Sequence, residues 1–173
     1  DYDYTPDIIT FAKGCNSGYV PAGGVIMSDP VAKYFDDVVF PGGLTYSGHP
    51  LAMGAIVATQ EAMEREHIVD NAHDVGRDIL GPDLQALAEH HPTVGEVRGK
   101  GVFWAVELVA DRTTKEPLDD ASMQRIVAEA DKLNLVLGVH NNRIHVTPPC
   151  VISAEEAAEG VARLDKAMTA AGC

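Results

Sequence analysis

Four short apolar segments lie between residues 94 and 146, and their spacing limits the folds open to this chain. They are rich in β-branched and aromatic side chains, which favour strands. Three residues, Gly99 to Gly101, separate the first two segments and predict a hairpin. The predicted strands are residues 94–98, 102–108, 135–139 and 143–146.

Helical patterns precede, separate and follow these strand pairs. A pattern over residues 68–89 contains Gly81-Pro82, which predicts a kink or a break because proline lacks a backbone donor. Another helix is predicted at 121–134. The last runs from Ser153 to about Ala170 and begins with the Ser-x-x-Glu spacing of a capping box. Residues 67–173 therefore predict a small α+β domain.

The first 66 residues have a different pattern. Strands are predicted at 7–12 and 25–27, around a glycine-rich loop at 13–24, and helices at about 28–36 and 50–66. Two short strands cannot form a stable sheet alone, so residues 1–66 are interpreted as the end of a larger α/β domain with a connecting helix. The chain opens directly into a strand without a Met, and we expect it to be part of a longer polypeptide.

Charge and cysteine content exclude several classes of function. The chain has 26 acidic and 13 basic residues, for a net charge of −13, so it has no electrostatic reason to bind nucleic acid or an anionic membrane. No run of eighteen apolar residues occurs. The three cysteines form no CxxC pair, which argues against a structural zinc site and predicts a cytoplasmic protein. We interpret His90-His91 as a polar helix end, and no metal site is predicted.

Lys13 is the candidate catalytic residue. It stands where the first predicted strand ends and the glycine-rich loop begins. Apolar neighbours tend to desolvate an amine, which lowers its pKa and favours the neutral form that attacks carbonyl carbon. The alternative is a surface lysine that closes a strand, and position alone does not decide between the two.

Four segments in order along the chain give this lysine a context. The first includes PDIITFAKG, in which Lys13 is the lysine, and continues through SGYVPAGG. The others are TYSGHP, VRGKGVFW and RIHVTPP. Together they closely resemble the class III aminotransferases, which are fold-type I enzymes dependent on pyridoxal 5′-phosphate (PLP). The segments span residues 6–149 and are specific as a set.

The resemblance implies a fold and a set of cofactor contacts. The chain would hold the end of the large α/β domain, a long connecting helix and the small α+β domain. Lys13 would bond to the cofactor aldehyde and then move a proton between the substrate carbon and the cofactor. Thr45 would bind the cofactor phosphate of the neighbouring subunit, with backbone contacts from Gly43 and Leu44. The resemblance further implies a homodimer or tetramer with its active site at the subunit interface.

The substrate contacts are less uniform within the family. Many members place an arginine three residues before the Pro-Pro pair, where it grips a carboxylate, and this chain has His145 there. Arg143 lies two residues earlier, on the same face of a strand. We expect Arg143 and His145 to be substrate contacts. A solvated Arg143 and a structural His145 are the alternatives. The sequence of residues 142–146, NRIHV, resembles that of family members that use taurine-like or ω-amino donors with pyruvate as acceptor.

The expected reaction is therefore transfer of an amino group from an amine or ω-amino acid to a keto acid such as pyruvate. Two alternatives remain: a PLP-dependent mutase or lyase on the same fold, or an inactive dimerisation fragment. The family's phosphate loop, its ring-stacking aromatic residue and its pyridine-binding aspartate have no counterpart in these 173 residues. We expect this segment alone to be inactive.

Overall fold

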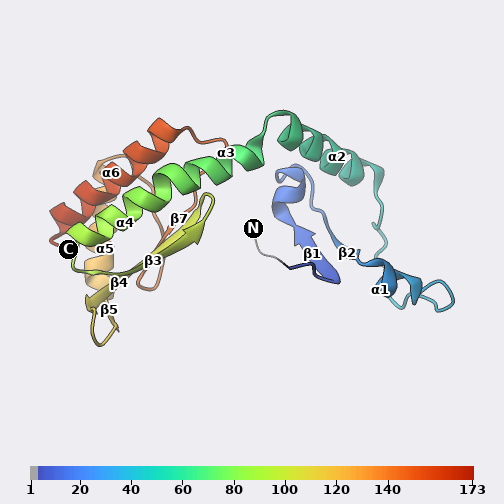
Figure 1. Cartoon of the computed structure of the whole chain (residues 1–173), viewed down its shortest axis with the longest axis horizontal. Helices are drawn as coiled ribbons and strands as arrows, with labels where there is room; N and C mark the ends of the chain where they lie inside the picture. The colour runs from blue at the N-terminus through green and yellow to red at the C-terminus, as the bar shows by residue number, and fades with distance from the viewer. Residues whose placement is uncertain (1–3) are drawn as a thin grey trace. The chain divides into compact units, whose positions relative to one another are not determined.

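The computed structural model describes residues 4–173, so the first three residues of the predicted 1–66 domain lie outside the described part. The chain divides into two compact units between Glu66 and His67. Figure 1 shows the first unit in blue to teal and the second in green to red.

The first unit is built on an antiparallel hairpin and one long helix. Strands β1 (Ile8–Ala12) and β2 (Gly23–Met27) pair with Ile8 opposite Met27 and Ala12 opposite Gly23. A 3-10 turn (Lys13–Asn16) follows β1, and α1 (Asp29–Lys33) follows β2. Helix α2 (Pro50–Arg65) closes the unit. Within this unit the hairpin leaves large apolar side chains exposed, among them Ile8, Ile9, Val25 and Ile26.

The second unit contains an antiparallel sheet in the order β3-β4-β7-β6, with β5 paired to β4. Alternate residues of its central strand point to opposite faces. Val106 and Leu108 are buried in the core, whereas Glu107 between them is partly exposed on the other face. The strands are β3 (Val94–Lys100), β4 (Phe103–Asp111), β5 (Glu116–Pro117), β6 (Gly138–His140) and β7 (Arg143–Val146).

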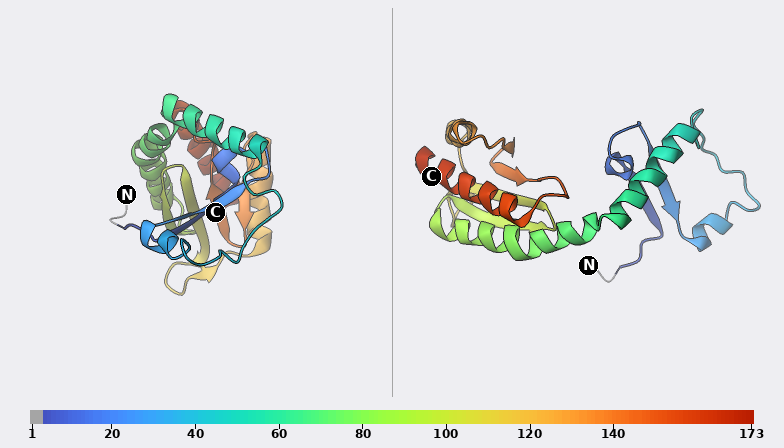
Figure 2. Two further views of the ribbon diagram at one scale, coloured as in Figure 1. Left: turned by 90° about the vertical axis from the view of Figure 1, so that its right-hand side faces the viewer. Right: turned by 90° about the horizontal axis from the view of Figure 1, so that it is seen from above.

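Helices supply the other side of this core. Figures 1 and 2 show α4 and α6 side by side, and α5 also contacts α6. Fully buried side chains from all three helices, such as Leu84, Ile126 and Leu164, join Val106 and Ile144 of the sheet in one cluster. The opposite face of the sheet carries mainly charged and polar residues. The helices are α3 (Ile68–Val75), α4 (Gly81–His90), α5 (Asp120–Lys132) and α6 (Ala154–Ala171).

A π-helical turn (Gly76–Leu80) joins α3 to α4, and the right-hand view of Figure 2 shows the three segments as one long curved helix. Pro82 lacks an N–H and sits in the first turn of α4, directly after the π turn. At Gly76 the helix touches the β3–β4 hairpin. A Cβ atom there would lie 2.0 Å from the carbonyl oxygen of Gly101, so only glycine fits.

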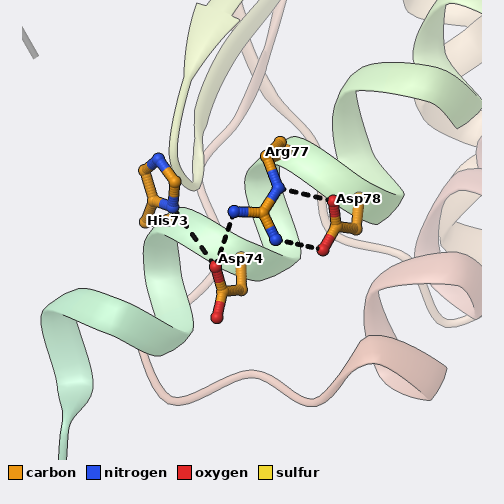
Figure 3. Close-up of polar contacts among 4 residues, drawn as sticks. All are labelled: His73, Asp74, Arg77 and Asp78. Carbon is orange, nitrogen blue, oxygen red and sulfur yellow. Dashed lines mark hydrogen bonds and ion pairs between the residues drawn. The ribbon is translucent and has the colours of Figure 1, made fainter.

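The outer surface of this helix carries a small ion-pair network (Figure 3). Arg77 donates to both oxygens of Asp78 and lies 3.1 Å from Asp74, which also contacts His73. The hydrogen bond from Arg77 lowers the pKa of Asp78, and the pKa of Arg77 rises above its usual value. All four side chains are exposed, so this network contributes little to stability.

His91 directly follows α4 and is buried. The residue is only 4% exposed, and its Nδ1 donates to the carbonyl of Cys173 at 2.7 Å. Nε2 lies 2.8 Å from Oδ1 of Asp165 on α6. The interpretation of His90-His91 as a polar helix end is right. His90 is the last residue of α4, and His91 caps the helix and ties it to α6.

Predicted and observed elements differ mainly in one strand. Residues 135–139 were expected to pair, but only Gly138–His140 does so, and that part of the prediction is wrong. Asn134 adopts a left-handed conformation after α5, and the amide of Leu135 then donates to Ala130 at 3.0 Å. This is the Schellman helix end, which turns residues 135–137 away from the ladder. No helix in residues 4–173 is long and apolar enough to cross a membrane.

Candidate functional site

Lys13 follows the last residue of β1 and begins the 3-10 turn, as the sequence predicted for a lysine at a strand end. Its φ of 54° lies in the left-handed region, which is uncommon for residues other than glycine. Asn16, which is buried, fixes the following loop: its side chain donates to the carbonyl of Val20 and accepts from the amide of Gly18. Backbone strain of this kind concentrates at functional sites.

The surroundings of Lys13 are more open than its neighbours in sequence suggested. Lys13 is exposed, and its amine bonds to no residue in the described part of the chain. Residues 4–66 therefore do not supply the desolvation that we expected from the apolar strand. The loop itself is anchored to α2, because Gln60 donates to the carbonyl of Cys15 at 3.1 Å.

Thr45 lies in an exposed turn just before α2. The turn is closed by the Ser47 amide, which donates to the Leu44 carbonyl at 3.0 Å, and by the Leu44 amide, which donates weakly to the Ser47 hydroxyl at 3.3 Å. The hydroxyl and amide of Thr45 have no partner among residues 4–173. Space beside Gly43 is open, since a Cβ there would meet nothing within 4 Å.

Arg143 and His145 lie on β7 and, being two residues apart, share one face of the sheet. Both are partly buried. In the ladder, Arg143 is opposite Glu107 of β4 and His140 of β6, and His145 is opposite Ala105 and Gly138. Arg143 forms no ion pair or hydrogen bond within the described residues.

Three residues near Arg143 were not singled out from the sequence: Arg98, Glu107 and His140. Arg98 lies 3.0 Å from Glu107, and the His140 and His145 rings are 6.4 Å apart between centroids. Only the register of four strands, β3, β4, β7 and β6, places them on one face of the sheet, and no local motif signals it. A groove of about 350 Å³ also opens beside His145, between the end of β7, residues 135–138 and α6.

Comparison with known proteins shows which family the chain belongs to. Residues 1–168 match the Aminotransferase class-III family. An uncharacterized aminotransferase, YhxA, of Bacillus subtilis is 35% identical over 90% of this chain and 36% of its own length. A taurine–pyruvate aminotransferase of Bilophila wadsworthia is 33% identical over 97% of this chain and 40% of its own.

Solved structures agree. The chain superposes with a TM-score of 0.87 on a taurine:2-oxoglutarate aminotransferase from Bifidobacterium kashiwanohense in complex with PLP and glutamate, at 36% identity over 96% of this chain and 38% of that one. A PMP-bound aminotransferase from Vibrio fluvialis gives 0.89 at 28% identity, over 99% of this chain and 39% of that one. The predicted α/β fold of a fold-type I PLP enzyme is confirmed.

The chain spans about two fifths of the length of the curated relatives and solved structures that it matches. The match nevertheless covers nearly all of its own residues, from the first strand to the last helix. The cofactor of this family is PLP, in agreement with the sequence-based expectation. The chain belongs to the class III aminotransferases.

Proposed function

We propose that the protein to which these residues belong is a PLP-dependent aminotransferase that transfers the amino group of an ω-amino donor, of the taurine type, to a keto acid such as pyruvate. Family membership supports the reaction class. The names of the relatives, which include taurine–pyruvate aminotransferases from more than one genus, support the donor and the acceptor. The observation that carries the proposal is Lys13, held at a strand end in a strained conformation with its amine unpaired within residues 4–173.

The residues present fit the cofactor. An aldehyde needs a primary amine that is not engaged in an ion pair, and Lys13 offers one. A phosphate needs donors in an open turn, and Thr45 offers a hydroxyl and an amide, both without a partner among the described residues. Gly43 leaves room for a ligand to approach the backbone.

The chain's own residues then have separable roles. Lys13 Nζ holds the cofactor and, once displaced by the substrate amine, carries the proton to and from the substrate carbon. The cofactor, when bound, supplies the electron sink that stabilises the charge left on that carbon. Thr45, with backbone groups of Gly43 and Leu44, binds the phosphate of the neighbouring subunit's cofactor.

Arg143 and His145 are proposed to bind the acidic group of the substrate. A guanidinium forms two parallel hydrogen bonds to a carboxylate or a sulfonate, and Arg143 has no competing partner within the described residues. His145 lies on the same face of β7 and can add a further donor. The role of the arginine that many family members carry three residues before Pro-Pro would thus be divided here between Arg143 and His145.

The organisation of the whole protein follows from these roles. Residues 1–66 are proposed to end the large PLP-binding domain and residues 67–173 to form the small domain. The active site would lie at the interface of a cytoplasmic homodimer or tetramer. A protein limited to this segment would lack the remaining cofactor contacts and would not transaminate.

Product analysis with the intact holoenzyme tests the reaction class. Incubation with taurine and pyruvate should yield alanine in a one-to-one ratio to the donor amine consumed. Loss of the donor amine as free ammonia, or migration of the amino group within the donor with no alanine formed, would instead identify a lyase or a mutase.

A further inference from the structure

A row of charged side chains crosses the outward face of the sheet in the second unit. In the ladder, Glu96 of β3 is opposite Glu107 of β4, and Glu107 is opposite Arg143 of β7. Side chains directly opposite one another have Cβ atoms about 5 Å apart. Glu107 is therefore a neighbour of Arg143, the proposed substrate contact, and is within reach of its guanidinium.

Glu107 is bonded elsewhere. Arg98, two residues along β3 from Glu96, reaches both carboxylates: one terminal nitrogen lies 3.0 Å from Glu96 and the other 3.0 Å from Glu107. The Glu107 side chain is only 28% exposed and that of Arg98 is 41% exposed. Arg143, beside this pair, has neither an ion pair nor a hydrogen bond within residues 4–173.

We propose that Arg98 keeps Arg143 available to the substrate by holding the Glu107 carboxylate, so that Arg98 and Glu107 are positioning residues of the substrate site. This inference rests on the proposed function of Arg143. The substrate class that it concerns is a donor with an acidic group, sulfonate or carboxylate, at the end opposite its amine. The Glu107 carboxylate and that acidic group are both anions that a single guanidinium can bind. By pairing with Glu107, Arg98 prevents that carboxylate from competing with the substrate for Arg143.

The expected size of the effect follows from the exposure of these groups. A partly exposed ion pair contributes up to about 1 kcal/mol, which corresponds to about a fivefold change in affinity. Releasing Glu107 should therefore weaken binding of an acidic donor about fivefold, and should leave the machinery that acts on the donor's amine in place.

The test uses the intact PLP-loaded enzyme and variants Arg98→Gln, Glu107→Gln, the double variant and Arg143→Gln. The donor half-reaction is followed by the cofactor's absorbance, with taurine and with n-butylamine, an uncharged amine. Binding of ethanesulfonate, which lacks an amine, is measured by calorimetry as a readout independent of turnover. Arg77→Gln is the matched control, because Arg77 also bridges two carboxylates but lies on the helix and not in the sheet.

We expect Arg98→Gln to lower the taurine-to-butylamine ratio and ethanesulfonate affinity about fivefold each, and the added Glu107→Gln to restore both. Arg77→Gln should change neither. A loss in Arg98→Gln that Glu107→Gln fails to restore would overturn the inference, because Arg98 would then not act through Glu107. The inference would also be overturned if Arg98→Gln changed neither quantity while Arg143→Gln lowered the taurine-to-butylamine ratio. That result would leave the proposed function of Arg143 intact. If Arg143→Gln changes nothing, the assignment of Arg143 itself fails.

Discussion

Lys13 and Gly76 occupy two positions at which the backbone restricts the choice of residue. Lys13 occupies a left-handed conformation that costs a residue with a side chain about 1–3 kcal/mol, so backbone preference does not favour a lysine there. Gly76 is the reverse case, since a close approach of two backbones excludes any side chain. The sequence revealed the first residue by its motif. It gave no sign of the second, because Gly76 and Gly101 meet only after the hairpin and the helix have packed.

Gly76→Ala should destabilise the second unit by about 1–3 kcal/mol, because the new Cβ would lie 2.0 Å from the Gly101 oxygen and the helix or the hairpin must shift. Gly160→Ala is the control. Gly160 lies within α6 with nothing within 4 Å of an added Cβ, so alanine should stabilise by about 0.5–1 kcal/mol. Urea unfolding gives both values. Equal effects of the two substitutions would show that the close contact at Gly76 is not formed.

Thr45→Ala should weaken cofactor binding about tenfold or more, because a hydrogen bond to a charged phosphate contributes about 1.5–3 kcal/mol. Thr45→Ser keeps the hydroxyl and should bind nearly as tightly as the parent. The measurement is the equilibrium constant for PLP loss from the intact enzyme. A Thr45→Ala enzyme that retains PLP as well as Thr45→Ser does would remove Thr45 from the phosphate site.

Helix ends and strand pairings were not equally visible in the sequence. The capping box at Ser153 was predicted from spacing alone and is formed, with hydrogen bonds of 3.1 and 3.0 Å between Ser153 and Glu156. Local bonds of this kind depend on neighbouring residues only. The two-residue strand β5 and the π turn were not predicted. The two residues of β5, Glu116 and Pro117, are too few and too polar to show an apolar strand pattern, and the π turn lies inside a continuous helical pattern. The apolar run at 135–137 looked like a strand, but the Schellman end of α5 determines its path.

The start of α5 makes its stability dependent on pH. Asp119 accepts hydrogen bonds from the hydroxyl and amide of Ser122, which lower the pKa of its carboxyl below the usual value. A lowered folded-state pKa means that this contribution to stability is present above the unfolded-state pKa and is lost as the pH falls through the folded-state pKa. Asp119→Asn can still cap the helix but does not titrate. Between pH 7 and pH 3 the variant should therefore lose less stability in urea unfolding than the parent. Equal losses would mean that Asp119 has no such role.

At the scale of the whole chain, sequence motifs were enough to indicate the family. The net charge of −13 argues against binding to nucleic acid or to an anionic membrane. The four ordered segments indicated the family that the comparisons show. The candidate site was less predictable. Lys13, Thr45, Arg143 and His145 were proposed from their place in motifs, whereas Arg98 and Glu107 could be proposed only from the register of β3, β4 and β7. Motifs consist of residues that are close in sequence, whereas residues that are neighbours across strands can be far apart in sequence.

The central claim is that the amine of Lys13 bonds to PLP. The most direct measurement is borohydride reduction of the intact protein loaded with PLP, followed by mass spectrometry of its peptides. We predict a pyridoxyl group on Lys13 and none on Lys33, an exposed lysine of α1 that serves as an internal control. An intact, PLP-loaded protein that carries the label elsewhere and leaves Lys13 unmodified would contradict the account.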